Sequence, residues 1–239
     1  MITRGPVGRA MSSLHSEVWA ALGTVLDPEL DEPITELDFV ASCTVSQDGV
    51  ATIVLRLPTF FCAPNFSFLM VADAYDAVSA VPGVTRAEVE LADHHASAEI
   101  NSGVSAQAGF VETFAGEATA ELDELRTQFL TKAAVAGQDR VARPLVDAGV
   151  GPEELAELTL GAVAPSADLT RLRERRAAIG LPHGDDAPLL VHADGSRVTS
   201  AQVPLHLRRA RVTRIGIEAN GEYCKSLLKS RYATAATAP

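Results

Sequence analysis

Apolar residues near the N-terminus recur with the period of an amphipathic helix. Between residues 13 and 26 they are spaced three or four positions apart, at Leu14, Val18, Ala21, Leu22 and Val25. This spacing puts them on one face of a helix. The helix should end at Asp27-Pro28, because proline disfavours helical geometry in the residue before it. We therefore expect a helix over 13–26 that packs one face against a core.

The following segments alternate between apolar and polar residues, as half-buried strands do. Residues 39–46 and 50–57 have this pattern, and Asp48-Gly49 between them is a strong signal for a hairpin. Residues 84–91 alternate in the same way, with charged side chains at every second position. We therefore expect three strands, the first two of which form a hairpin.

Helical periodicity returns between the hairpin and the third strand. An apolar stripe follows Pro64-Asn65, and Pro82-Gly83 ends it; its members are Phe66, Leu69, Met70, Ala74, Ala77, Val78 and Val81. The order helix, strand, strand, helix, strand predicts an α+β domain over 13–105. One face of its sheet should be covered by helices and the other exposed to water.

The second half of the chain has a different pattern. Residues 93–112 are rich in Ala, Ser and Gly and are interpreted as a connector. Helical spacing predicts four short helices within a helical region over 106–182. They are expected around 122–133, around 141–146, from Pro152, and from 169 to Gly180.

Residues 183–232 are expected to form a small C-terminal α/β unit. Its strands are predicted at Leu189–His192 and Val212–Glu218, and its helices at Ser200–Arg211 and Glu222–Arg231. Residues 1–12 and 233–239 are expected to be flexible tails.

Charge and cysteine content restrict the class of protein. The net charge is −11, and residues 1–110 contain 14 acidic and 4 basic residues. Such an acidic half argues against binding of nucleic acid or of an anionic membrane. No apolar run reaches the roughly 18 residues needed to span a bilayer. Three widely spaced cysteines without a CxxC pair indicate reduced thiols, and we expect a cytoplasmic protein.

The segment before the second predicted helix contains the most informative cysteine. Cys62 would lie just outside the helix N-terminus, where unpaired N–H groups and the helix dipole favour a thiolate. A thiolate serves as a metal ligand or a nucleophile. The alternative is a small buried residue that fills space between helix and sheet. The chain has no GxGxxG, GxSxG or HExxH motif, which counts against nucleotide-dependent or hydrolytic chemistry.

The order of several short motifs resembles a known family. Asp27-Pro28-Glu29-Leu30, a hairpin, Thr59 and Cys62 before a helix, and Pro82-Gly83-Val84 before a final strand are similar to the metal–sulfur (iron–sulfur) cluster assembly factors. That family includes the bacterial PaaD-like and SufT-like proteins and the MIP-eighteen component of eukaryotic iron–sulfur assembly. The resemblance covers residues 14–92. It implies a non-enzymatic factor that matures iron–sulfur or related metal centres in client proteins.

The resemblance also implies roles for single residues. Cys62 matches the family's reactive cysteine, Thr59 the threonine before it, and Asp27 and Glu29 its acidic turn. One well-placed cysteine cannot hold a cluster that commonly takes four thiolates. We therefore expect a transient cluster or iron, bound either in a homodimer or between a client metalloenzyme and a cluster donor. By analogy with the PaaD-like branch, the client would be a component of a di-iron oxygenase.

An alternative function is a metal-free adaptor or folding chaperone for a specific enzyme complex. The apolar Phe60-Phe61 pair and the long extension beyond the family segment favour it. His94 and His95 offer a second, weaker metal site, against an ordinary solvated loop. Cys224 is interpreted as a core residue.

A cluster of arginines suggests where a partner would bind. Arg208, Arg209 and Arg211 lie close together in a predicted helix of the C-terminal region. Arginine is favoured at interfaces, so these residues are predicted to recognise the client, against the alternative of a solvated helix face.

Overall fold

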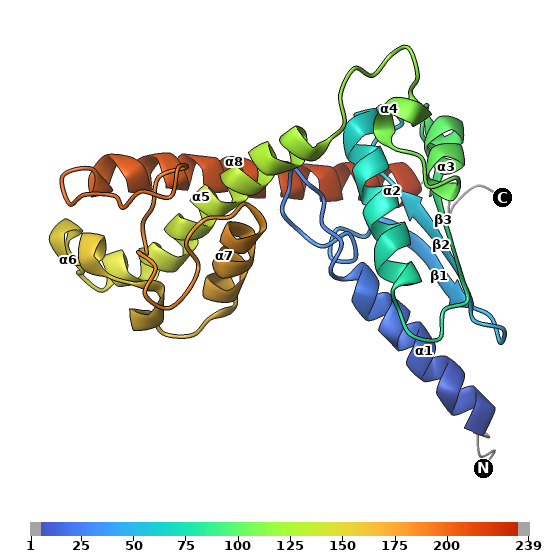
Figure 1. Ribbon diagram of the computed structural model, residues 1–239, viewed down its shortest axis with the longest axis horizontal. Helices are drawn as coiled ribbons and strands as arrows, with labels where there is room; N and C mark the ends of the chain where they lie inside the picture. Colours follow the sequence, from blue (N-terminus) through green and yellow to red (C-terminus); the bar gives the residue numbers. More distant parts are fainter. Residues whose placement is uncertain (1–5, 234–239) are drawn as a thin grey trace. The chain divides into compact units, whose positions relative to one another are not determined.

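The computed structural model describes residues 6–233, and side chains from Ser13 onward (Figure 1). The expected tails at 1–12 and 233–239 therefore lie mostly outside the described residues, except that helix α1 already begins at Pro6. The chain divides into two compact units. Unit 1 comprises Met1–Leu122 and Asn220–Pro239, and unit 2 comprises Asp123–Ala219.

Unit 1 contains the predicted α+β arrangement. In chain order its first elements are α1 (Pro6–Leu22), β1 (Val40–Val45), β2 (Val50–Arg56), α2 (Pro64–Ser79) and β3 (Arg86–Ala92). The sheet order is β1-β2-β3; β1 and β2 pair antiparallel, while β2 and β3 pair parallel. The helix-strand-strand-helix-strand order and the α+β class are confirmed.

The core of unit 1 lies between the sheet and helices α1 and α2. Alternate residues of β2, namely Ala51, Ile53 and Leu55, are buried, and the residues between them are partly exposed. The helices contribute Val18 and Leu22 from α1 and Ala74 and Val78 from α2 to the same core. This alternation is what one covered sheet face requires.

The expected connector at 93–112 is wrong in part, because it contains two helices. These are α3 (Ser97–Ser105) and α4 (Phe110–Thr113). Helix α3 buries Ile100 and Val104. The side chain of Asn101 also accepts a hydrogen bond from the Leu91 N–H at 2.8 Å and donates one to the Leu91 carbonyl at 3.1 Å. Helix α3 is therefore held against β3 by the two hydrogen bonds of the Asn101 side-chain amide as well as by two apolar residues.

Unit 2 is helical. It contains α5 (Asp123–Asp147), α6 (Pro152–Glu157), a 3-10 turn (Leu160–Ala162), α7 (Ala167–Ala178) and the first part of α8 (Val203–Ala233). The 25-residue α5 replaces the two separate helices predicted for this segment. Helix α6 begins at Pro152 and α7 ends before Gly180, as predicted.

The predicted C-terminal α/β unit is wrong, since the described residues of 183–232 contain no strand element. Leu189, Leu190 and Val191 are buried, but only Val191 and the preceding Pro188 take part in isolated bridges. The predicted strand Val212–Glu218 lies inside α8, a helix of 31 residues. There Arg214 pairs with Asp139 and, one helical turn away, with Glu218, both at 2.6 Å. These contacts stabilise the helix by more than the β-branched residues of the segment favour a strand.

The unit boundaries consequently differ from the expected divisions at 105 and 182. The last turns of α8 belong to unit 1, where Leu228 is buried in the core and Cys224 and Tyr232 pack against it. None of the described helices combines the length and apolarity that crossing a membrane would require.

Candidate functional site

Cys62 lies in the loop between β2 and α2, as the sequence predicted. The residue after it, Ala63, is the N-cap of α2 and has an extended backbone (φ −62°, ψ 129°). Ala63 has no side chain that could cap the helix, and Asn65 Oδ1 accepts a hydrogen bond from the Phe66 N–H in the first turn at 2.9 Å. Cys62 is half-buried, so it is neither fully buried in the core nor fully exposed to water.

Thr59 is oriented toward the cysteine. Its Oγ1 lies 3.3 Å from Cys62 Sγ and accepts a hydrogen bond from the Phe61 N–H at 3.2 Å. Because the Phe61 N–H already occupies a lone pair of the hydroxyl, the hydroxyl hydrogen is free to point at the sulfur.

His94 fixes the backbone of the cysteine loop. It is buried, and its Nε2–H donates to the carbonyl of Cys62 at 2.7 Å, while its Nδ1 accepts from the Ala96 N–H at 3.2 Å. Burial lowers the pKa of His94, which keeps the ring neutral. Both ring nitrogens have partners within the chain, so His94 has a structural part here, and the metal site considered for His94 and His95 stays a prediction.

His95 lies among two exposed aromatic side chains. Its Nδ1–H donates to the Phe60 carbonyl at 3.0 Å, and its ring centroid is 5.8 Å from that of Phe61. Phe60 and Phe61 are 45% and 78% exposed, with their rings edge to face. Large exposed aromatic side chains of this kind mark contact sites for other molecules. The site therefore presents an apolar surface directly beside Cys62.

The acidic turn lies between α1 and β1. Asp27 is buried, and its Oδ1 accepts hydrogen bonds from the N–H groups of Glu29 and Leu30, both at 2.8 Å. Burial raises the pKa of Asp27 to about 6 despite these bonds. The Glu29 carboxylate accepts a hydrogen bond from Asn220 at 3.4 Å. Asp27 therefore shapes the turn, and Glu29 connects it to α8.

Cys224 packs against the core of unit 1, in agreement with its interpretation as a core residue. Cys224 is half-buried in the part of α8 that belongs to unit 1. Burial raises the pKa of its thiol to about 11, and the charges of Asp27, Cys62 and Glu29 raise it further. Cys224 thus lies within electrostatic reach of the family-motif residues. No local sequence signal connects positions so far apart in the chain.

The described residues contain no group of three or more His, Cys, Asp or Glu side chains arranged to hold a metal ion. A complete set of protein ligands is therefore not assembled within the part of the chain that the structure describes. Any metal held here would draw its remaining ligands from outside this set.

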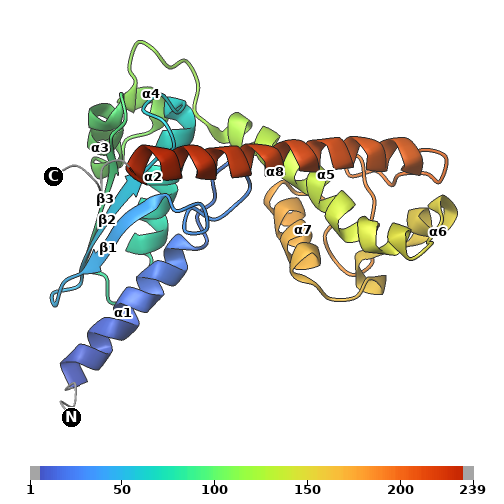
Figure 2. The same ribbon diagram turned by 180° about the vertical axis from the view of Figure 1, so that it is seen from behind.

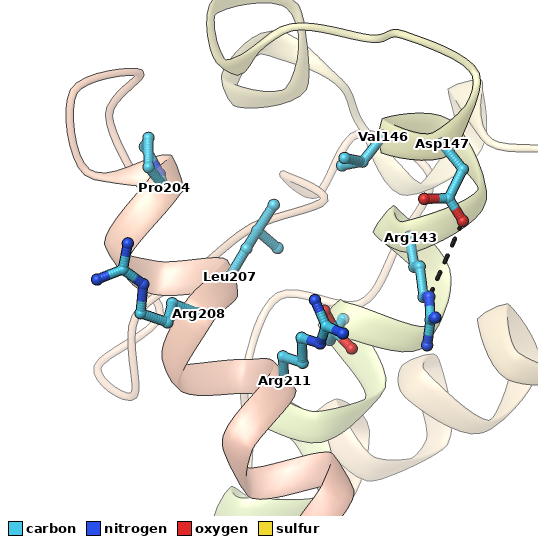
Figure 3. Close-up of a pocket in the computed structure, with 8 residues that line it drawn as sticks. Arg143, Val146, Asp147, Pro204, Leu207, Arg208 and Arg211 are labelled. Carbon is cyan, nitrogen blue, oxygen red and sulfur yellow. Dashed lines mark ion pairs between the residues drawn. The ribbon is translucent and has the colours of Figure 1, made fainter.

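The predicted arginine cluster is divided by the structure. Arg208 and Arg211 of α8 line a pocket of about 470 Å³ together with Arg143 of α5, which pairs with Asp147 at 3.9 Å. Figure 3 shows Arg208 and Arg211 on α8, with Arg143 and Asp147 on α5. Arg209 is exposed and does not line this pocket. Two of the three predicted arginines thus share a concave surface.

Comparison with known proteins identifies the first part of the chain. The model of the family described as "Iron-sulfur cluster assembly protein" matches residues 15–91. A crystal structure titled as a domain of unknown function, DUF59, from Bacillus anthracis is 26% identical. It aligns with 35% of this chain and 78% of its own, with a TM-score of 0.33. No curated protein matches. The matched segment contains the acidic turn, Thr59 and Cys62, and residues 15–91 are therefore a domain of the iron–sulfur cluster assembly protein family.

Proposed function

We propose that this protein is a non-enzymatic maturation factor that holds iron or an iron–sulfur cluster transiently on Cys62 and passes it to a client metalloprotein. The observation that carries the proposal is the 3.3 Å approach of the Thr59 hydroxyl to the Cys62 sulfur, within the family-matched segment. The iron is cargo rather than a resident cofactor. The family supports a part in iron–sulfur assembly, and the thiol is the soft ligand that iron–sulfur cargo needs.

The surroundings of Cys62 suit brief binding at a surface. The half-buried Cys62 immediately precedes Ala63, the N-cap of α2, and the dipole of a helix favours negative charge at its N-terminus. His94 holds the loop through the Cys62 carbonyl, so the sulfur position is maintained without cargo. The exposed Phe60 and Phe61 give a client or a cluster donor an apolar contact beside it.

The metal test compares cysteine variants of the full chain. After anaerobic reconstitution with iron and sulfide, wild type should carry iron, and Cys62→Ser should carry several-fold less because a ligand is lost. Cys43→Ser is the matched control, since Cys43 is also half-buried but lies in strand β1. Equal iron content in wild type and Cys62→Ser would contradict the proposal.

Client recognition is proposed for the arginine pocket of unit 2. Arg208 and Arg211 have no ion-pair partner among the described residues, and their guanidinium groups fit carboxylates of an acidic partner. By analogy with PaaD-like factors, a component of a di-iron oxygenase is the proposed client. The two acidic residues that also line the pocket, Asp139 and Asp147, pair with Arg214 and Arg143. The remaining cations, Arg208 and Arg211, favour a negatively charged partner and speed its association.

The structure provides a matched control for this assignment. The double variant Arg208→Glu, Arg211→Glu should weaken capture of the proposed client, a component of a di-iron oxygenase, by about 1–3 kcal/mol. Arg209→Glu reverses one charge on the same helix outside the pocket, and should change capture by less than about 1 kcal/mol, whereas Arg208→Glu alone or Arg211→Glu alone reverses one charge within it. If both variants weaken capture equally, the effect is general charge and the pocket is not the binding site.

The alternative function is a metal-free adaptor, which the exposure of Phe60 and Phe61 favours. In that case the aromatic pair binds the client and Cys62 is dispensable. Phe61→Ser would then abolish capture of the client, while Cys62→Ser would leave both capture and client activity at wild-type levels. Loss of client activity in Cys62→Ser with normal capture would exclude the adaptor.

A further inference from the structure

A pocket of about 610 Å³ lies in unit 1 beside the loop that contains Cys62. Ala63, Pro64 and Asn65, the three residues that follow the cysteine, form one side of it. The other sides come from the start of α3 and from the segment between Phe110 and Leu122. Figure 2 shows α3 and α4 at the same end of α2. A group bound in this pocket is therefore next to the Cys62 loop.

Three half-buried side chains, Phe110, Phe114 and Leu122, give the pocket an apolar floor. The centroid of the Phe110 ring is 5.5 Å from that of Phe68 in the core and 4.8 Å from that of Phe114. The floor is thus a part of the core of unit 1 that is not fully covered. It favours an apolar side chain of another molecule, because contact removes apolar surface from water.

The segment that forms this floor is held in place by contacts within unit 1. The Glu121 carboxylate accepts hydrogen bonds from the N–H groups of Phe110 at 2.9 Å and Val111 at 3.2 Å. Gly103 of α3 has no room for a side chain, because a Cβ there would overlap the side chain of Thr113. The pocket is therefore formed in the free protein, and a ligand need not order the segment first.

The charged groups beside the apolar floor are carboxylates. Glu99 and Glu117 line the pocket, both are exposed, and neither has an ion-pair partner among the described residues. No lysine or arginine of the described chain lines the pocket. His95 also lines it, and its ring centroid is 5.8 Å from that of the exposed Phe61, whose face can bind a cation. The pocket is therefore complementary to a positive charge beside an apolar side chain.

We propose that this pocket binds a segment of the recipient protein in which a large apolar side chain lies next to lysine or arginine. The apolar side chain packs on the floor of the pocket, and the cation pairs with Glu99 and Glu117. As it places the recipient beside Cys62, this assignment rests on the proposed function. The contact is separate from the arginine pocket of unit 2 and selects the opposite charge, so the two sites together distinguish one partner from others.

The test uses three peptides with the same fluorescent label and follows their binding to full-length protein by fluorescence anisotropy without iron. The probe GSRFRSG has an aromatic side chain between two cations. GSEFESG reverses its charges and GSRSRSG removes its aromatic side chain. Each of these two should bind at least ~10-fold more weakly than the probe, because each lacks one of the two complementary features.

Variants of the protein locate the bound probe. Glu99→Gln and Glu117→Gln, each made alone, should weaken binding of GSRFRSG about threefold. Glu112→Gln is the matched control, since Glu112 is exposed in α4 but does not line the pocket. Ala118→Trp fills the pocket and should weaken binding at least ~10-fold, whereas Ala115→Trp, at an exposed position outside it, should not.

Equal binding of the three peptides, no binding of any of them, or wild-type affinity of Ala118→Trp for GSRFRSG would overturn the assignment. These measurements contain no iron, so such a result leaves the iron test of Cys62→Ser unaffected. Wild-type iron content in Cys62→Ser, with selective binding of GSRFRSG retained, would instead remove the proposed function and leave a peptide-binding pocket. Melting curves establish that each variant is folded, and Ala118→Lys, which repels the cations of the probe, replaces Ala118→Trp if the larger side chain unfolds unit 1.

Discussion

Leu228→Ala tests whether the last turns of α8 complete the core of the family domain. The Leu228 side chain is 3% exposed and packs with the core residues of unit 1, although it lies far beyond the family-matched segment. Truncating a buried leucine removes apolar burial and leaves a cavity, at a cost of about 2–5 kcal/mol. Helix α8 ends at Ala233, so its last turn can shift into part of the cavity. We therefore expect the lower half of this range, about 2–3 kcal/mol.

The chain provides a natural probe for this measurement. Trp19 is its one tryptophan and belongs to α1 of unit 1, so its fluorescence follows unfolding of unit 1. For a domain of this size the expected loss lowers the urea midpoint by about 1–2 M. Tyr223→Ala is the control, because Tyr223 is a large side chain of the same helix that is 65% exposed. The free energy of unfolding of this variant should stay within about 0.5 kcal/mol of wild type.

A wild-type midpoint for Leu228→Ala would refute this reasoning. The family domain would then be stable without α8, and a fragment ending at residue 105 would fold alone. If the expected loss is seen, such a fragment lacks part of its core. It would also expose apolar surface that Phe110, Phe114 and Leu122 cover in the full chain.

Three further substitutions test individual contacts. Asp27→Asn keeps the oxygen that accepts from two backbone N–H groups. Because the pKa of Asp27 is about 6 in the folded protein instead of 3.8, wild type loses stability as pH rises from about 4 to 6 and the uncharged variant does not. The variant should therefore gain up to about 3 kcal/mol over wild type across this pH range, measured by urea unfolding. Arg176→Met leaves the carbonyls of Pro188 and Leu189 without their donor and should lower the stability of unit 2 by about 3 kcal/mol. The control Arg173→Met removes a more exposed ion pair and should cost about 1 kcal/mol or less. Both losses are measured from unfolding followed by circular dichroism. Thr59→Val should slow alkylation of Cys62 about fivefold, and Thr59→Ser should restore it. The part assigned to Asp27 is contradicted if Asp27→Asn and wild type have the same pH dependence. The part of Arg176 is contradicted if the two arginine variants melt alike, and that of Thr59 if Thr59→Val and wild type are alkylated at the same rate.

The first part of the fold was predictable because its residues have a clear period. A strand with one buried face must alternate, as Val50–Arg56 does, and a helix that packs on it must carry a stripe, as Pro64–Ser79 does. Each segment also has a turn signal at its end. Local preference, pattern and tertiary packing agree here, and in such cases sequence alone determines the elements.

The errors occur where tertiary contacts decide the outcome. Helix α3 has few apolar residues, and its place depends on the paired hydrogen bonds between Asn101 and the Leu91 backbone. The β-branched Val212–Glu218 is helical because Arg214 is within reach of Asp139 on another helix. Neither partner can be identified from neighbouring sequence, so a period-based prediction could not include it.

The same distinction applies to the site. The spacing of Thr59 and Cys62 before a helix is local, and it was recognisable as a motif. The parts of His94 and Cys224 depend on contacts with segments far away in the chain. For His94 the sequence offered only two adjacent histidines, which suggested a ligand, whereas its buried ring is used to hold the Cys62 carbonyl.

The number of thiolates matters for how cargo is transferred. Four thiolates satisfy a cluster and make it a resident group, whereas one gives little selectivity for a soft metal over competing cations. Under the proposed function, Cys62 would give the iron one sulfur ligand and leave its other positions open to incoming thiolates. A recipient would then be able to bind before the carrier sulfur leaves, and iron would pass by ligand exchange without being released into water.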